Sequence, residues 1–113
     1  MTPAQTIGNT ILQQLGGNKF RAMTGAKDFI AGQTKEGLYY LQFSLPGRLA
    51  KNGINRVKIV LNGSDLYNVK FSTIRKQRCG FDYLETVKSE SSDVYAEDLQ
   101  DVFEHSTGLY THL

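Results

Sequence analysis

The chain has 113 residues, of which 40% are hydrophobic and 21% are charged, and it contains six Tyr and six Phe. This length and composition are typical of a globular rather than a disordered chain and predict one domain, residues 1–113, that is large enough to bury its own core. The formal net charge is only +2, yet residues 1–80 hold twelve of the thirteen Lys and Arg residues while residues 81–113 hold eight of the eleven Asp and Glu residues, a separation that indicates a charged partner.

The first predicted element is an N-terminal helix. Residues 2–5 (Thr-Pro-Ala-Gln) match the spacing of a capping box, in which the first and fourth residues satisfy each other's backbone N–H groups. Ile7, Ile11 and Leu15 recur every four residues and predict one apolar stripe along this helix. The pair Gly16-Gly17 then supplies a left-handed stop.

From residue 18 to about residue 88, apolar and polar residues alternate, which predicts antiparallel strands with one apolar and one polar face. The clearest runs are residues 19–24, 39–45, 56–61 and 67–72, with weaker ones near 29–31 and 81–87. Turn sequences separate these runs, and the best of them, Asn62-Gly63-Ser64-Asp65, predicts a tight hairpin.

A second helix is predicted near the C-terminus, with Asp93 as its N-cap and Gly108 as its stop. Its apolar face follows helical spacing and consists of Tyr95, Leu99, Val102, Phe103 and Ser106. The predicted fold is therefore α+β, a meander of about five antiparallel strands flanked by an N-terminal and a C-terminal helix that cover its apolar face.

If both helices cover the apolar face, the polar side chains of the strands share the opposite face. Cations and rings on an open sheet face are typical of modules that bind single-stranded nucleic acid, because cations contact phosphates and rings stack on bases. The candidate binding residues are Lys19, Arg21, Tyr40, Arg56, Lys58, Lys70, Arg75, Lys76 and Arg78.

Two other interpretations of these charges stay open. Lys and Arg on a solvated strand face also serve solubility and protect sheet edges, and the sequence pI of 8.7 lies below the value of about 9 typical of nucleic-acid-binding domains. The acidic C-terminal helix, for its part, either neutralises the basic sheet within the fold, contacts a cationic partner, or is simply a solvated face.

Residues for catalysis or metal binding are few. Cys79 is the only cysteine, and the two histidines, His105 and His112, both lie in the last nine residues. Asp101 and His105 stand four apart on the predicted helix, where a surface ion pair is the expected arrangement since no third ligand has metal-site spacing. We therefore expect no catalytic residue, no metal and no cofactor, and we predict that the protein is not an enzyme.

The single cysteine also bears on the compartment. It excludes an internal disulfide framework and indicates a reducing environment. The sequence shows no secretory signal and no apolar run of about 18 residues. We expect a cytoplasmic protein that does not contact a membrane.

Several segments resemble a family of small proteins found in bacteriophages and in mobile elements of bacteria. The resemblance lies in residues 10–20, 23–27, 52–61, 65–71 and 107–110. It implies the cytoplasm of a bacterial host cell but assigns no activity and no residue roles. In that setting we expect a small binding module whose partner is nucleic acid; the alternative is a protein-interaction module, such as an inhibitor of a host-defence protein or a self-assembling subunit.

Overall fold

The computed structural model describes residues 2–46, 50–76, 83–109 and 111. Within these ranges, five strands form one antiparallel sheet: β1 (Lys27–Gln33), β2 (Tyr39–Ser44), β3 (Arg56–Leu61), β4 (Tyr67–Lys76) and β5 (Tyr83–Val94). Each strand pairs with the next one along the chain, which confirms the predicted meander. The predicted α+β fold is likewise confirmed.

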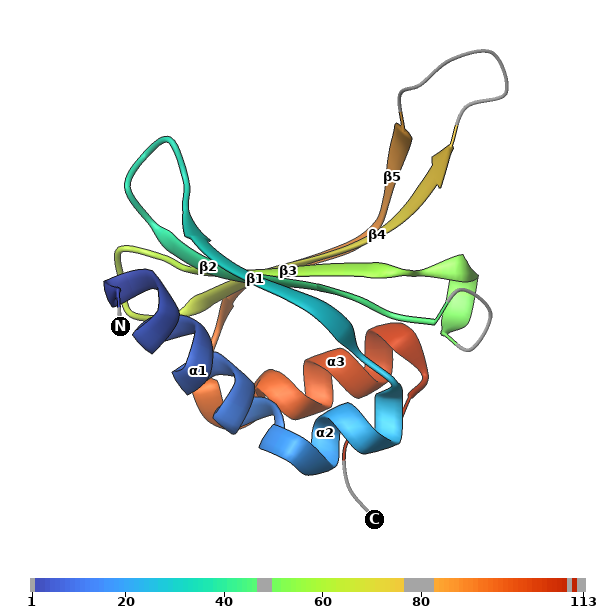
Figure 1. The fold of residues 1–113 in the computed structure, drawn as a ribbon, viewed down its shortest axis with the longest axis horizontal. Coiled ribbons are helices and arrows are strands. Elements are labelled where there is room, and N and C mark those ends of the chain that lie inside the picture. The colour runs from blue at the N-terminus through green and yellow to red at the C-terminus, as the bar shows by residue number, and fades with distance from the viewer. Residues whose placement is uncertain (1, 47–49, 77–82, 110, 112–113) are drawn as a thin grey trace.

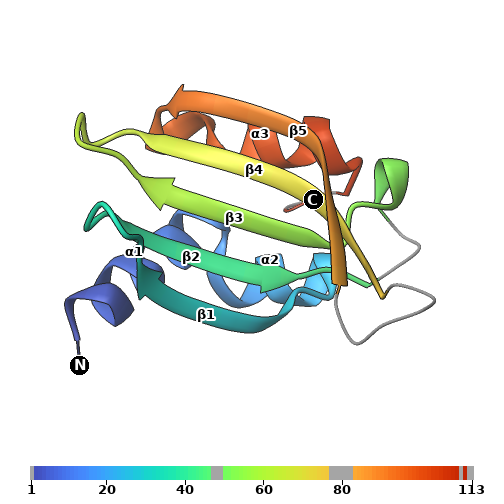
Figure 2. The same ribbon diagram turned by 90° about the horizontal axis from the view of Figure 1, so that it is seen from above.

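The described α-helices all pack on one face of the sheet: α1 (Pro3–Leu15), α2 (Gly17–Thr24) and α3 (Leu99–Thr107) (Figure 1). Viewed from above, the strands lie in front and the helices behind them (Figure 2). The sheet therefore has one covered face and one face that none of the described helices covers. No helix among the described residues has the length and apolar character needed to cross a bilayer.

A cluster of four fully buried phenylalanines joins the helices to the sheet. The ring of Phe20 on α2 lies edge-on to Phe43 of β2 at 5.5 Å and to Phe103 of α3 at 5.0 Å, measured between centroids. Phe71 of β4 lies 6.3 Å from Phe103. Because each burial of such a ring is worth about 1.5–3 kcal/mol, this cluster fixes the helices against the covered face.

The N-terminal helix begins as predicted. The Thr2 hydroxyl accepts a hydrogen bond from the backbone N–H of Gln5 at 3.2 Å, and the Gln5 side chain accepts one from the N–H of Thr2 at 3.0 Å. This is the reciprocal pair of a capping box, so that prediction is confirmed. Ile11 and Leu15 are fully buried against the sheet.

The segment 19–24, predicted as a strand, is instead part of helix α2. Phe20 and Thr24 are four residues apart and both are buried, whereas Ala22 between them is exposed. A strand would have placed all three on one face, but a helix buries only the residues at the i, i+4 spacing. Gly25 then ends the helix in the left-handed conformation (φ 72°), with its N–H bonded to the carbonyl of Arg21.

The second correction concerns Asp93, which was predicted to cap the C-terminal helix. Strand β5 continues to Val94, a short 3-10 turn (η2, Ala96–Asp98) follows, and α3 begins only at Leu99. The run from Lys88 to Ser92 has no apolar alternation because β5 is an edge strand and most of its residues are exposed. Gly108 ends α3 as predicted.

The predicted hairpin between β3 and β4 is confirmed. The side chain of Asn62 accepts hydrogen bonds from the N–H groups of Ser64 (2.8 Å) and Leu66 (3.2 Å), which closes the turn locally. A second 3-10 turn, η1 (Lys51–Gly53), precedes β3.

Candidate functional site

The open face of the sheet carries a row of cations on its two inner strands. Lys58 of β3 lies directly opposite Lys70 of β4. Two residues along the same strands, Arg56 lies opposite Ser72. These residues alternate with the buried Val57, so their side chains point away from the helices. The structure thus brings together three of the predicted binding residues.

Each of the two lysines has a partner that offsets part of its charge. The Lys58 ammonium lies 4.5 Å from the centroid of the Tyr40 ring, within the range of a cation–π contact. The Lys70 ammonium lies 3.5 Å from Oε2 of Glu85, and 35% of its side chain is exposed. Both ammonium groups therefore remain accessible while their positions on the face are held.

Tyr40 belongs to the open face as predicted, but one side of its ring already contacts the Lys58 ammonium group. It pairs with Gly32 of the edge strand β1, and its hydroxyl group lies so close that a Cβ at Gly32 would stand 2.7 Å from it. Glycine at this position lets the ring lie down across β1. In this position the ring already contacts the Lys58 ammonium group, so it serves as a contact for a cation rather than as a stacking surface for a base.

Carboxylates from β5 reach the same face, whereas the sequence analysis considered neutralisation only by the acidic C-terminal helix, which lies on the covered side. Glu90 is paired with Lys70, and Glu85 is paired with Ile74. Oε2 of Glu85 accepts a hydrogen bond from the Ser72 hydroxyl at 2.8 Å. This hydrogen bond lowers the pKa of Glu85, and the positive charges of Lys70 and Arg56 add to the effect, while partial burial opposes it.

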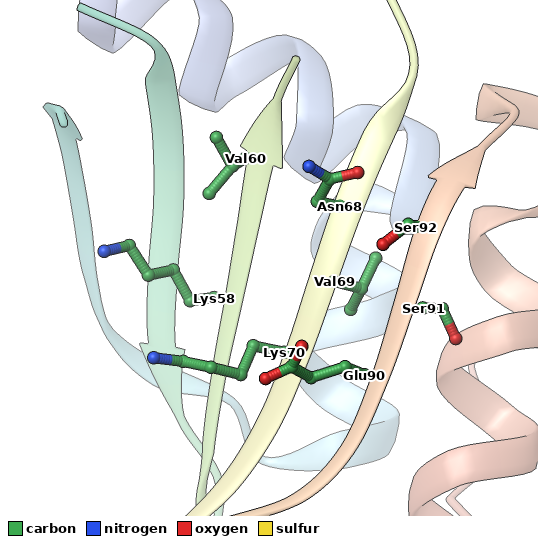
Figure 3. A pocket seen from close by; sticks show the side chains of 8 residues that line it. All are labelled: Lys58, Val60, Asn68, Val69, Lys70, Glu90, Ser91 and Ser92. Atoms are coloured by element: carbon green, nitrogen blue, oxygen red, sulfur yellow. The ribbon is translucent and has the colours of Figure 1, made fainter. Parts of the chain in front are cut away.

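A shallow hollow of about 240 Å³ lies over β3, β4 and β5. Its lining residues are labelled in Figure 3, where the side chains of Lys58 and Lys70 extend in the same direction across the sheet. Glu90 extends from β5 toward Lys70 (Figure 3). Asn68 and Ser92 also line the hollow, together with the backbone near Ser91, whose hydroxyl points away from it (Figure 3).

Beyond the body of the sheet, β4 and β5 continue as a two-stranded arm. β3 pairs with β4 only as far as Ser72, whereas β4 and β5 stay paired to Lys76 and Tyr83. Figure 1 shows this arm bending away from the helices, so that it rises beside the open face. The site is therefore concave where the arm leaves the sheet.

Of the predicted basic window, residues 75–78, the structure describes Arg75 and Lys76, and both belong to the β4 strand of this arm. Arg75 is exposed, but strand alternation points its side chain to the side opposite Ser72 and Ile74, away from the open face. Lys76 ends β4. Arg78 lies outside the described residues, as do Cys79 and His112.

Lys19 and Arg21 do not belong to the open face, which corrects the sequence-based prediction. Both lie on α2, on the helix-covered side of the molecule. The Arg21 guanidinium lies 5.4 Å from the ring centroid of Phe29, and that ring packs on Phe43 in the covered layer. The misplacement follows directly from the helix that replaces the predicted strand.

The sequence analysis missed two residues of the face, Tyr83 and Glu85. Together with Arg56 and Ile74 they line a second hollow, of about 410 Å³, where the arm meets the sheet. The available signal was the alternation of Tyr83, Glu85 and Val87 within a run that had been predicted as a strand. It was overlooked because an acid in the middle of an exposed strand gives no apolar pattern.

Among the described residues, no group of three or more His, Cys, Asp or Glu side chains is placed to hold a metal ion. Asp101 and His105 both lie exposed on α3, outside the open face. Comparisons of the chain with protein-family models, with curated proteins and with solved structures found no match. The resemblance to small phage proteins accordingly stays a prediction.

Proposed function

We propose that this protein is a non-catalytic module that binds single-stranded nucleic acid on the open face of its sheet. The observation that carries the proposal is the cross-strand pair of Lys58 and Lys70. Like charges directly opposite each other destabilise a sheet, so a sequence selected for stability alone would avoid this arrangement. A bound phosphate would satisfy both ammonium groups at once.

The surroundings of the pair support the same partner. Arg56 lies two residues from Lys58 on β3, about 7 Å along the strand, so three cations follow one another across the face. The arm beside them makes the surface concave (Figure 1). A basic track in a concave surface fits a flexible single strand, which follows the cations and leaves its bases free to find flat side chains.

The carboxylates on the same face limit the strength of binding to an anionic strand and contribute to its selectivity, but they do not prevent binding. Glu85 and Glu90 offset part of the positive charge, so we expect moderate affinity that depends on few phosphates. If Arg56, Lys58 and Lys70 each contact one phosphate, the logarithm of the association constant plotted against the logarithm of the salt concentration should have a slope of about −2 for a single strand. We place this activity in the cytoplasm of a bacterial host, a proposal that rests on the sequence resemblance and the lone cysteine.

Fluorescence anisotropy with a labelled oligonucleotide tests the proposal. We expect binding at low salt that weakens steeply as salt rises, and we expect Lys58→Glu with Lys70→Glu to abolish it. Lys19→Glu is the matched control for either single substitution, because it makes the same charge change on the helix side and should leave affinity nearly unchanged. If the wild-type protein does not bind at low salt, or Lys19→Glu is as damaging as the double variant, the proposal fails.

A second candidate function, a self-assembling subunit, is favoured by the edge strand β5. Its exposed side chains include the large apolar groups of Tyr83, Leu84 and Val87, with 67%, 53% and 45% of their surfaces exposed. An uncovered edge strand with apolar side chains is suited to pairing with the same strand of a second copy. Sedimentation velocity over a range of protein concentrations distinguishes this candidate, since it requires a dimer that Val87→Lys disrupts.

A further inference from the structure

The hollow at the root of the arm brings together four kinds of side chain: an aromatic ring, a carboxylate, an aliphatic group and a guanidinium. Tyr83 and Glu85 come from β5, Ile74 comes from β4, and Arg56 is the first residue of β3. Ile74 and Glu85 are direct cross-strand partners. The volume of about 410 Å³ falls within the range of about 300–1,000 Å³ typical of small-molecule sites.

Tyr83 offers an exposed ring as a stacking surface. Two thirds of the residue is exposed, and among the described residues it makes no ring–ring or cation–π contact. Tyr40, by contrast, already contacts the Lys58 ammonium. Stacking of a base on an aromatic ring is worth about 1–3 kcal/mol, so Tyr83 is the better platform of the two.

Glu85 offers a fixed acceptor beside that ring. The Ser72 hydroxyl (2.8 Å) and the Lys70 ammonium (3.5 Å) both contact Oε2, which holds the carboxylate in one orientation. Ser72 is itself 1% exposed and therefore a rigid anchor. Oε1 has no hydrogen-bond partner among the described residues, and it is the atom left to receive a ligand.

A carboxylate only accepts hydrogen bonds, so its ligand must present N–H groups with no acceptor facing it. The Watson–Crick edge of guanine presents two adjacent donors, N1–H and the N2 amino group. Adenine and cytosine present one amino group next to an acceptor nitrogen, and thymine or uracil presents one N–H between two carbonyls. In single strands these edges are free to be read by side chains.

We propose that the hollow at the root of the arm binds an unpaired guanine, stacked on Tyr83 with its Watson–Crick edge on Glu85, while Arg56 contacts a neighbouring phosphate. This assignment rests on the proposed function and makes it specific for guanine-containing single strands. An arginine side chain of a protein partner would also suit Tyr83 and Glu85. The nearby positive charges of Arg56 and Lys70 disfavour it, because a second guanidinium would meet like charges there.

The test compares oligothymidylates of about ten nucleotides that carry one central guanine, one central inosine or no substitution. Inosine lacks only the N2 amino group. We expect wild-type protein to bind the guanine strand about tenfold more tightly than the other two, and Glu85→Gln to reduce the difference to within about twofold. Tyr83→Ala should weaken the guanine strand most, and Tyr83→Phe should restore it.

Glu97→Gln is the matched control, because it removes an exposed carboxylate that lies on η2, outside both hollows, and should leave the preference intact. Thermal unfolding of each variant verifies that the fold is retained. Equal binding of all three strands, or a guanine preference that survives Glu85→Gln, would overturn the guanine site and leave the proposed function standing. Absence of binding to every strand would overturn both, and capture of an arginine-rich peptide dependent on Glu85, without guanine preference, would replace the base by a protein ligand.

Discussion

The side-chain amide of Asn55 pairs with both backbone groups of Ile74. Its Nδ2 donates to the Ile74 carbonyl oxygen at 3.0 Å, and its Oδ1 accepts from the Ile74 N–H at 2.8 Å. Asn55 stands just before β3, so its side chain continues the pairing of β3 with β4 after the backbone ladder has ended. This contact fixes the arm where it leaves the sheet and thereby positions the hollow beside Glu85.

We expect Asn55→Ala to destabilise the protein by about 1–2 kcal/mol, because both groups of Ile74 lose a half-buried partner. Relative to the wild type, amide hydrogen exchange should become faster in the arm than in the sheet body. The preference for guanine should also fall. Urea unfolding and hydrogen exchange measure the two effects. A uniform rise in exchange across the whole sheet would contradict a local role for Asn55.

The Lys58–Lys70 pair should be measurably repulsive in the free protein. In a double-mutant cycle with Lys58→Gln and Lys70→Gln, we expect an unfavourable coupling of about 0.2–1 kcal/mol in the free energy of unfolding. The cycle removes the separate contributions of the Tyr40 ring and Glu85 to each lysine.

The coupling should shrink at high salt, as expected for charges near the surface. Saturating oligonucleotide should reverse its sign, because a shared phosphate makes the two lysines mutually supportive. A coupling of zero at low salt would remove the argument that this pair is retained for binding.

The sheet was predictable because β2, β3 and β4 bury alternate residues on one face. Leu41 and Phe43, or Val57 and Ile59, are buried while their neighbours are not, and this period of two is visible in the sequence. α2 was misassigned because Phe20 and Thr24 satisfy both periods: they are an even number of residues apart and also four apart. A segment of eight residues is too short for pattern alone to decide between the two.

The binding face was predictable only where a residue stands between buried neighbours. Lys58 and Lys70 meet this condition, Arg56 has one buried neighbour in Val57, and the structure brings the three together. Tyr83 and Glu85 do not, because both faces of the arm are exposed and burial imposes no pattern there. Their proximity to Arg56 depends on the bend of the arm, which no local sequence signal encodes.

The helical assignment of residues 17–24 leads to a stability prediction. Phe20→Ala should cost about 3–5 kcal/mol, because it removes a fully buried ring that contacts Phe43 and Phe103. Ala22→Ser is the matched control on the exposed side of the same helix and should change stability by less than about 0.5 kcal/mol. Chemical denaturation of both variants tests this; a large loss with Ala22→Ser would instead fit a strand that buries Ala22.

Glu85 gives the protein a stability contribution that depends on pH. The pKa of Glu85 in the folded protein lies below its ordinary value of 4.5, chiefly because of the hydrogen bond from Ser72. A group with a lowered folded pKa stabilises the fold when it is ionised in both states, and this contribution disappears as the pH falls through the folded pKa. The stability difference between wild type and Glu85→Gln should therefore be constant near neutral pH and shrink from about pH 5 downward.

Ser72→Ala isolates the cause of that pH dependence. Without the hydroxyl donor, the pKa of Glu85 should move back toward its ordinary value, and the acid-dependent loss of stability attributable to Glu85 should become smaller. NMR titration of the Glu85 carboxyl carbon in both proteins measures the shift directly. If the titration midpoint is the same in both, Ser72 does not hold Glu85 ionised, and the rigid acceptor that the guanine site requires loses its anchor.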